Sequence, residues 1–148
     1  MSINQKIKYL VKHYTKLLGT NNPIAIAKYL GIQIAYLPLG NTLGHYQYIK
    51  RTKWIFVNED ILDNENLLHV VVAHELGHAL LHVRENCCFM SHHTLLLTSK
   101  IERQANLFAS VLLITDDMLN DFKECTIDQF SSCTGLDKEL IKLRLGME

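Results

Sequence analysis

Several features that point to other classes of protein are missing from this sequence. Lys and Arg balance Asp and Glu at 15 each, so no net charge favours bulk attraction to nucleic acid or to an anionic membrane. No hydrophobic run approaches the length of a membrane span, and residues 1–5 do not open a signal peptide. No internal repeat, low-complexity run or linker rich in Pro or Ser divides the chain. We therefore expect the 148 residues to form a single domain, located in the cytoplasm.

Cysteine lacks the spacing of a structural metal site. The four cysteines are Cys87, Cys88, Cys125 and Cys133. The adjacent pair is not a CxxC motif, and no second CxxC exists to complete a zinc knuckle. Reduced thiols in a cytosolic protein are the simplest interpretation.

What the sequence does contain is an H-E-x-x-H motif, His74 to His78, inside an apolar run. Residues four apart lie on the same face of a helix, so His74 and His78 would direct two imidazoles at one zinc ion. Glu75 lies about 100° around the helix, within reach of a water on that ion. Zinc lowers the pKa of a bound water from about 16 toward 7, and a neighbouring carboxylate takes the proton as the water attacks a carbonyl. The motif predicts a metallopeptidase.

The alternative is a His pair that only bonds to its neighbours inside a buried helix. The surrounding residues are apolar nearly all round, which is typical of a central helix. They are Val70, Val71, Val72, Leu76, Ala79, Leu80 and Leu81. Burying His-Glu-His in such a helix without partners would cost several kcal/mol, about the penalty of unpaired polar groups. The apolar surroundings therefore favour metal binding.

The hydrophobic pattern predicts helices before and after a small sheet. Helices are expected at residues 3–18, 24–30, about 65–83, 95 to about 113, 116–122, 127–132 and 136–145. A strand is expected at 32–37, an antiparallel hairpin at 44–49 and 53–57, and a loop at 84–94. This order predicts an α+β fold, with a small antiparallel or mixed sheet and a C-terminal group of short helices around the motif helix.

A catalytic zinc ion needs a third protein ligand and an open position for water. His82 continues the helical ladder, but two turns span about 11 Å, so we expect it to hydrogen-bond beneath the site instead. His92 or His93, in the expected loop, would close an all-histidine site, and Glu85 lies just past the helix.

Glu102 is a better candidate for the third ligand. It belongs to the second strong helix, which must pack against the motif helix to cover its apolar surface. Asn106 follows four residues later on the same face, where its amide would fix the tautomer of a ligating imidazole. Spacing alone leaves open that Glu102 lies on a solvated face with Lys100 and Arg103.

The segment His74 to His82, followed by Glu102-x-x-Ala105-Asn106-x-Phe108-Ala109, resembles the ImmA/IrrE family of zincin-like metallopeptidases. The resemblance extends back to residues 44–58 and forward to 126–145, most of the chain. Thr115 departs from the pattern, since relatives often have proline there; this affects a helix start and not the chemistry.

The resemblance implies a single zincin-like domain, with Glu102 as the third zinc ligand and Glu75 as the general base. It also implies a cytosolic bacterial endopeptidase encoded by a prophage or mobile element. Such enzymes cleave a helix-turn-helix repressor and so release its genes. Two imidazoles and a carboxylate suit zinc best, although nickel, cobalt or manganese can fill such a site in a purified sample.

The substrate would pair with an exposed strand of the sheet. His45, Tyr46 or Tyr48 would then stabilise the tetrahedral oxyanion, unless they are ordinary sheet residues.

Two other functions stay open on the sequence. A zinc-dependent binding protein that sequesters a repressor without cutting it would carry the same residues. A DNA-binding regulator is disfavoured, although residues 127–145 have the outline of a helix-turn-helix. Three acidic residues there cancel Lys138, Lys142 and Arg144, so the charge needed for phosphate contact is missing. We expect no direct contact with nucleic acid or membrane.

Overall fold

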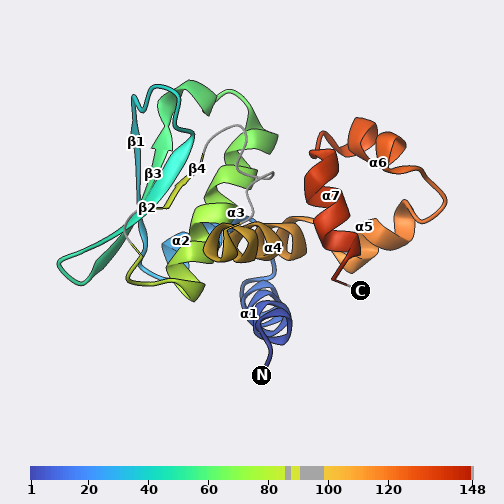
Figure 1. The fold of residues 1–148 in the computed structure, drawn as a ribbon, viewed down its shortest axis with the longest axis horizontal. Coiled ribbons are helices and arrows are strands. Elements are labelled where there is room, and N and C mark those ends of the chain that lie inside the picture. The colour runs from blue at the N-terminus through green and yellow to red at the C-terminus, as the bar shows by residue number, and fades with distance from the viewer. Residues whose placement is uncertain (86–87, 91–98, 148) are drawn as a thin grey trace.

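The computed structural model describes residues 1–85, 88–90 and 99–147 and has an α+β architecture (Figure 1). Its helices are α1 (Ile3–Leu18), α2 (Pro23–Tyr29), α3 (Glu65–Leu81), α4 (Lys100–Leu113), α5 (Asp116–Asp121), α6 (Ile127–Thr134) and α7 (Lys138–Leu145), with a 3-10 turn at Glu59–Ile61. Its strands are β1 (Gln33–Leu37), β2 (Gly44–Ile49), β3 (Thr52–Asn58) and β4 (Cys88–Met90). The predicted fold class is confirmed. None of the helices in these ranges is long and apolar enough to span a bilayer.

Local side chains explain where several helices begin. Ser2 accepts a hydrogen bond from the Gln5 amide while the Gln5 side chain accepts one from the Ser2 amide, which forms a capping box at α1. Thr126 and Gln129 repeat this arrangement at α6. At α2, Asn22 caps the helix and Pro23 occupies its first position, where its missing N–H costs nothing. Sequence signals of this kind are why most predicted helices agree with the structure.

The sheet is mixed, with strand order β1-β3-β2-β4. Strands β2 and β3 form the expected antiparallel hairpin, whose turn places Lys50 and Arg51 at positive φ (48° and 64°). Strand β1 pairs in parallel with β3.

Two expectations about residues 84–113 were wrong. Residues 84–94 were expected to be a loop, but Cys88–Met90 form β4, which pairs with β2 at Gly44 and His45. A three-residue strand depends on backbone pairing with a distant edge and has too few residues to show periodicity. The second strong helix was expected from Leu95, but Ser99 is extended (φ −60°, ψ 144°) and α4 begins at Lys100. Residues 95–98 lie outside the described ranges.

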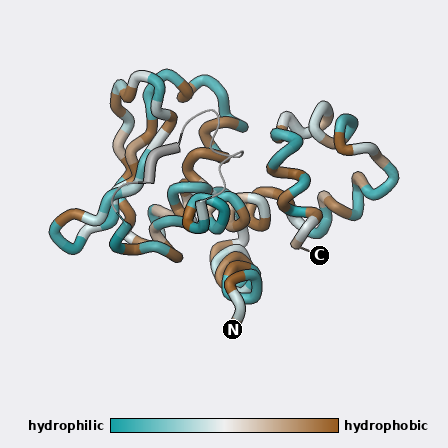
Figure 2. Tube along the Cα trace, in the orientation of Figure 1, coloured by the Kyte–Doolittle hydropathy of each residue, from teal (hydrophilic) through white to brown (hydrophobic). Residues whose placement is uncertain are grey.

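Helix α3 is the centre of the molecule, with every residue from Val70 to Ala79 buried. It contacts β2 and β3 on one side and α4 on another. Helix α4 also packs against α1 and α7, and Figure 1 shows α5–α7 grouped at the end of α4 away from the sheet. Hydrophobic and hydrophilic residues alternate along α1 and α7 (Figure 2), as expected for helices that turn one face to a core.

The thiols that the structure describes are unpaired. Cys125 and Cys133 are free and exposed. Cys87 lies outside the described residues, and so does the side chain of Cys88.

Candidate metal centre

A close approach between α3 and α4 creates the candidate site. A Cβ atom built on Gly77 would lie 3.2 Å from the Ala105 Cα and 3.1 Å from the Phe108 Cβ. Glycine inside a helix costs about 1 kcal/mol relative to alanine, but here the Cβ of any larger residue would crowd α4, which would have to shift by a few tenths of an ångström. The contact brings the first turn of α4, which carries Glu102, against the face of α3 that carries His74 and His78.

The three side chains meet at one point. The His74 Nε2 lies 3.0 Å from the Glu102 Oε2, and the His78 Nε2 lies 3.0 Å from the Glu102 Oε1. The two Nε2 atoms are 3.2 Å apart. His74 and His78 are fully buried, and Glu102 is 7% exposed. All three potential ligand atoms lie within 4.8 Å of one another, which is the arrangement of a compact three-ligand metal site.

Asn106 fixes the orientation of His74. The His74 Nδ1 lies 2.7 Å from the Asn106 Oδ1. An amide oxygen only accepts, so the Nδ1 carries the proton and donates it. In the neutral imidazole the Nε2 then holds a lone pair, directed at the cluster.

Two successive hydrogen bonds fix the orientation and tautomer of His78. The Gln104 Oε1 lies 2.7 Å from the His82 Nε2 and accepts its proton. The His82 Nδ1 is then an acceptor, and it lies 3.0 Å from the His78 Nδ1, which donates to it. The His78 Nε2 is left with a lone pair that also faces the cluster. Both imidazoles thus present the same nitrogen to the same point.

The charge states suit a cation. Burial lowers the pKa of His78, although the neighbouring Glu102 carboxylate acts in the opposite direction, so this imidazole is neutral at pH 7. Burial would raise the pKa of Glu102, but the neighbouring imidazoles of His74 and His78 lower it to about 2, so its carboxylate is ionised. Three electron-pair donors about 3 Å apart repel one another unless a proton or a metal ion lies between them. The donor set therefore fits a divalent metal ion.

Glu75 is fully buried beside this cluster. Neither of its carboxylate oxygens has a hydrogen-bond partner among the described residues. Burial, and then the negative charge of Glu102, raise the pKa of Glu75 well above its usual value. An unpartnered buried carboxylate with a strongly raised pKa is typical of a group that handles protons at a functional site.

Gly44 of β2 lies close to Glu75. A Cβ atom on Gly44 would lie 3.7 Å from the Glu75 Cγ, 2.7 Å from the Val71 Cγ1 and 2.9 Å from the Phe56 carbonyl oxygen. Only a residue without a side chain lets β2 pass so close to α3.

For the three residues considered for oxyanion stabilisation, the structure gives the following positions and contacts. The Tyr46 hydroxyl donates to the Val83 carbonyl at 2.6 Å, past the end of α3. His45 stacks on Phe56, with ring centroids 4.8 Å apart, on the sheet face opposite to Gly44. Tyr48 is four residues from Gly44, about 13 Å along the strand. A role for these three residues in stabilising the oxyanion therefore stays a prediction.

Of the other ligands considered, His82 lies behind His78 and outside the cluster. Glu85 is exposed. His92 and His93 lie outside the described residues. The prediction from sequence missed Gln104. Nothing in the sequence marks it, because its role depends on how α4 is rotated against α3.

The comparison with known proteins agrees with this geometry. The model of peptidase family M78, described as the IrrE N-terminal-like domain, matches residues 27–136. The chain belongs to this family. It is 37% identical over 141 residues to uncharacterized immunity region protein 2 of Bacillus phage phi105, covering 93% of this chain and 88% of that protein. It is 41% identical over 117 residues to metallopeptidase ImmA of Bacillus subtilis strain 168, covering 78% of this chain and 67% of that protein. No solved structure matches the chain.

These matches confirm the ImmA/IrrE resemblance. The matched range includes α3 and α4 and thus every residue of the cluster. By family the chain is a metallopeptidase, and His74, His78 and Glu102 form its candidate metal site.

Proposed function

We propose that this protein is a zinc-dependent endopeptidase that cleaves a helix-turn-helix repressor in the bacterial cytoplasm and so derepresses prophage or mobile-element genes. His74, His78 and Glu102 hold the ion, and Glu75 is the general base. The observation that carries the proposal is the convergence of two oriented Nε2 lone pairs and an ionised carboxylate beside the unpartnered Glu75.

The repressor as substrate rests on the family. Relatives of this chain are named a metallopeptidase and a phage immunity region protein, and the ImmA/IrrE resemblance implies a repressor as the protein that is cut. A peptidase that removes a repressor would end immunity without binding DNA itself.

The mechanism follows from the residues. When bound, a zinc ion supplies Lewis acidity that activates a water molecule and polarises the scissile carbonyl. The Glu75 carboxylate takes the proton of the attacking water and delivers it to the leaving amide nitrogen. Its raised pKa suits it to hold that proton between the two events. Asn106 and the His82–Gln104 pair keep both imidazoles from rotating.

The sheet offers a place for the substrate chain. Among the strands that the structure describes, β4 lies at the edge of the sheet, and its partner β2 carries Gly44 beside Glu75. An extended peptide that adds to this edge by main-chain hydrogen bonds would run close to the cluster.

The structure favours this function over DNA binding. In α6 and α7, Lys138 pairs with Asp128 at 2.9 Å and Lys142 pairs with Glu139 at 3.2 Å. Arg144 is buried and donates to Asp116 and to the Ile114 carbonyl oxygen. These cations are committed within the protein, so the two helices present little free positive charge to a phosphate backbone.

The test is co-expression with the repressor encoded beside this gene. We expect discrete repressor fragments with the wild-type chain. We expect a loss of about 10²–10⁴-fold in cleavage rate with Glu75→Gln, which keeps the shape of the side chain but removes the base. The Glu75→Gln protein should still retain zinc. Glu85→Gln makes the same chemical change at an exposed position and should cleave normally.

Three other results would contradict the proposal. Fragments that persist with Glu75→Gln would come from a contaminating protease. Repressor that is bound tightly but stays intact would indicate sequestration without cleavage. Sequence-specific operator binding by the purified protein would indicate a DNA-binding regulator.

A further inference from the structure

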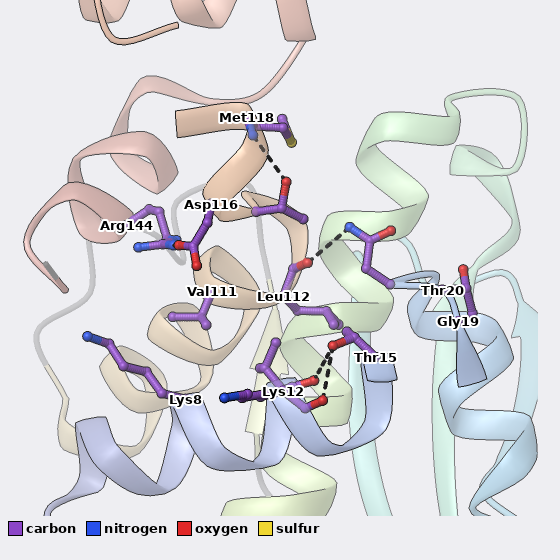
Figure 3. A pocket seen from close by; sticks show the side chains of 13 residues that line it. Lys8, Lys12, Thr15, Gly19, Thr20, Val111, Leu112, Asp116, Met118 and Arg144 are labelled. Atoms are coloured by element: carbon purple, nitrogen blue, oxygen red, sulfur yellow. Dashed lines mark hydrogen bonds and ion pairs between the residues drawn. The ribbon is translucent and has the colours of Figure 1, made fainter. Parts of the chain in front are cut away.

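A cavity of about 910 Å³ lies at the opposite end of α4 from the metal cluster. Its walls come from one face of α1, residues 19–21, the last turn of α4, the start of α5, and Arg144 of α7 (Figure 3). Val111 lies nine residues after Glu102, about 14 Å along the helix axis. The cavity is therefore a feature separate from the metal centre, and its volume is within the range of ligand-binding sites.

The chemistry of the walls is apolar with a positive rim. Val11, Val111 and Leu112 form an apolar floor. Lys8 and Lys12 are exposed and lie along the α1 side (Figure 3). Neither ammonium group forms an ion pair with any residue in the described part of the chain.

The remaining polar groups of the walls are already used within the protein. The Thr15 hydroxyl donates to the Val11 carbonyl at 2.7 Å. The Asn21 amide donates to the Leu112 carbonyl at 3.1 Å, and the Thr115 hydroxyl accepts from the Met118 amide. Asp116 and Arg144 also line the cavity, where they pair with each other at 2.7 Å. A ligand thus meets apolar surface, the two unpaired lysines and this ion pair, and has few hydrogen-bonding groups to use. This disfavours a sugar or a nucleotide and favours aliphatic side chains flanked by carboxylates.

The concentration of positive charge in α1 supports an acidic partner. The sequence as a whole is balanced at 15 basic and 15 acidic residues. Helix α1, however, contains four lysines and no Asp or Glu, in the segment Ile3–Leu18. Lys8 and Lys12 are one helical turn apart, a spacing that matches carboxylates three or four residues apart on a partner helix.

The position of the cavity supports a protein partner. The family model matches residues 27–136. Eight of the thirteen lining residues, from α1, residues 19–21 and α7, lie outside that range. Most of the cavity lining thus lies outside the part of the chain that the family model matches. Its concave shape suits a protruding side-chain cluster, whereas a bilayer surface is flat.

We propose that this cavity docks an acidic amphipathic segment of a partner protein. Apolar side chains of that segment cover Val11, Val111 and Met118, and its carboxylates pair with Lys8 and Lys12. The proposal is independent of the proteolytic function, since no residue of the metal cluster takes part.

The probe is a fluorescein-labelled synthetic helix with leucines on one face and glutamates flanking them, titrated with the full chain. One matched peptide replaces each Glu by Gln, and a second scrambles the sequence so that the apolar face is lost. We expect the Glu peptide to bind about tenfold more tightly than either control, since both the charge and the apolar face contribute.

Variants then locate the contact. Lys8→Glu combined with Lys12→Glu should weaken binding about tenfold or more, since two attractions become repulsions. Lys6→Glu combined with Lys16→Glu changes the charge of α1 equally, but neither residue lines the cavity, so binding should be nearly unchanged. All four lysines are exposed, so both variants should fold, which circular dichroism checks.

Several outcomes would overturn the proposal. The first is no binding at about 1 mM peptide, the weak limit of a specific contact. The second is equal weakening by both lysine pairs, which would mean general attraction to α1. The third is that vesicles containing phosphatidylglycerol or a DNA duplex bind with the same dependence on Lys8 and Lys12 while the peptide does not.

Discussion

The sharpest test of the metal centre is a substitution at Gln104, a residue that contacts neither the metal position nor the side chains that would bind the metal. Gln104 accepts a hydrogen bond from His82 at 2.7 Å, and His82 in turn accepts one from His78 at 3.0 Å. Replacing Gln104 by Leu removes the acceptor that sets the tautomer of His82. We therefore expect Gln104→Leu to weaken zinc binding although it leaves every ligand in place.

The magnitude follows from the chain of bonds. The lost Gln104–His82 bond is worth about 0.5–1.5 kcal/mol net. If His82 then rotates or changes tautomer, the partly buried His78 N–H loses its acceptor, at a further cost of about 1–3 kcal/mol. Groups that orient a ligating histidine change metal affinity by about 10–100-fold. Gln104 acts through one intermediate residue, so we expect the low end, about tenfold.

The assay is competition for zinc with a chromophoric chelator, together with thermal melting of the metal-free protein to check folding. Gln104→Glu should retain wild-type affinity, because a carboxylate accepts the same hydrogen bond. Arg103→Leu places the same new side chain at the exposed neighbouring position and should also have no effect. Wild-type affinity in Gln104→Leu, or an equal loss in Gln104→Glu, would refute the tautomer argument.

Other predictions test the ligands, the helix contact and the thiols. Glu102→Ala should abolish stoichiometric zinc retention, measured by metal analysis after gel filtration; full retention would transfer the third ligand to His92 or His93. Gly77→Ala inserts a methyl group 3.2 Å from the Ala105 Cα; we expect about 1–3 kcal/mol of lost stability on denaturant unfolding, together with weaker zinc binding, because overpacking separates α3 from α4. An unchanged free energy of unfolding would mean that α3 and α4 accommodate the methyl group without loss of stability. A thiol titration of the denatured protein, kept free of oxidant, should count four free groups, and a count of two would indicate a disulfide.

The central helix and the grouping of its polar side chains were predictable because they depend on short-range spacing. His74 and His78 share a face of any regular helix that contains them, and Glu75 stands beside them for the same reason. Capping residues such as Ser2 and Thr126 mark helix starts locally. The family was also predictable, since its two motifs lie within two single helices.

The features that the sequence could not predict depend on how separate helices and strands pack against one another. Strand β4 exists through pairing with β2, and a three-residue segment carries no period of its own. Gly44 adjoins Glu75 because of where the sheet crosses α3, whereas His45, Tyr46 and Tyr48 were considered only for their polar groups. The chemical type of a side chain does not reveal where its strand lies relative to α3.

The candidate metal site also combines features that short-range spacing predicts with features that depend on tertiary packing. The sequence by itself determined two imidazoles and a carboxylate on one helix. Only the tertiary structure decided that Glu102 faces them and that Gln104 completes the chain behind His78. Both depend on the rotation of α4 about its axis, which is set by the contact of Gly77 with Ala105 and Phe108. Periodicity identifies the apolar face of a helix, but the tight packing at one glycine decides which polar residues beside that face meet the partner.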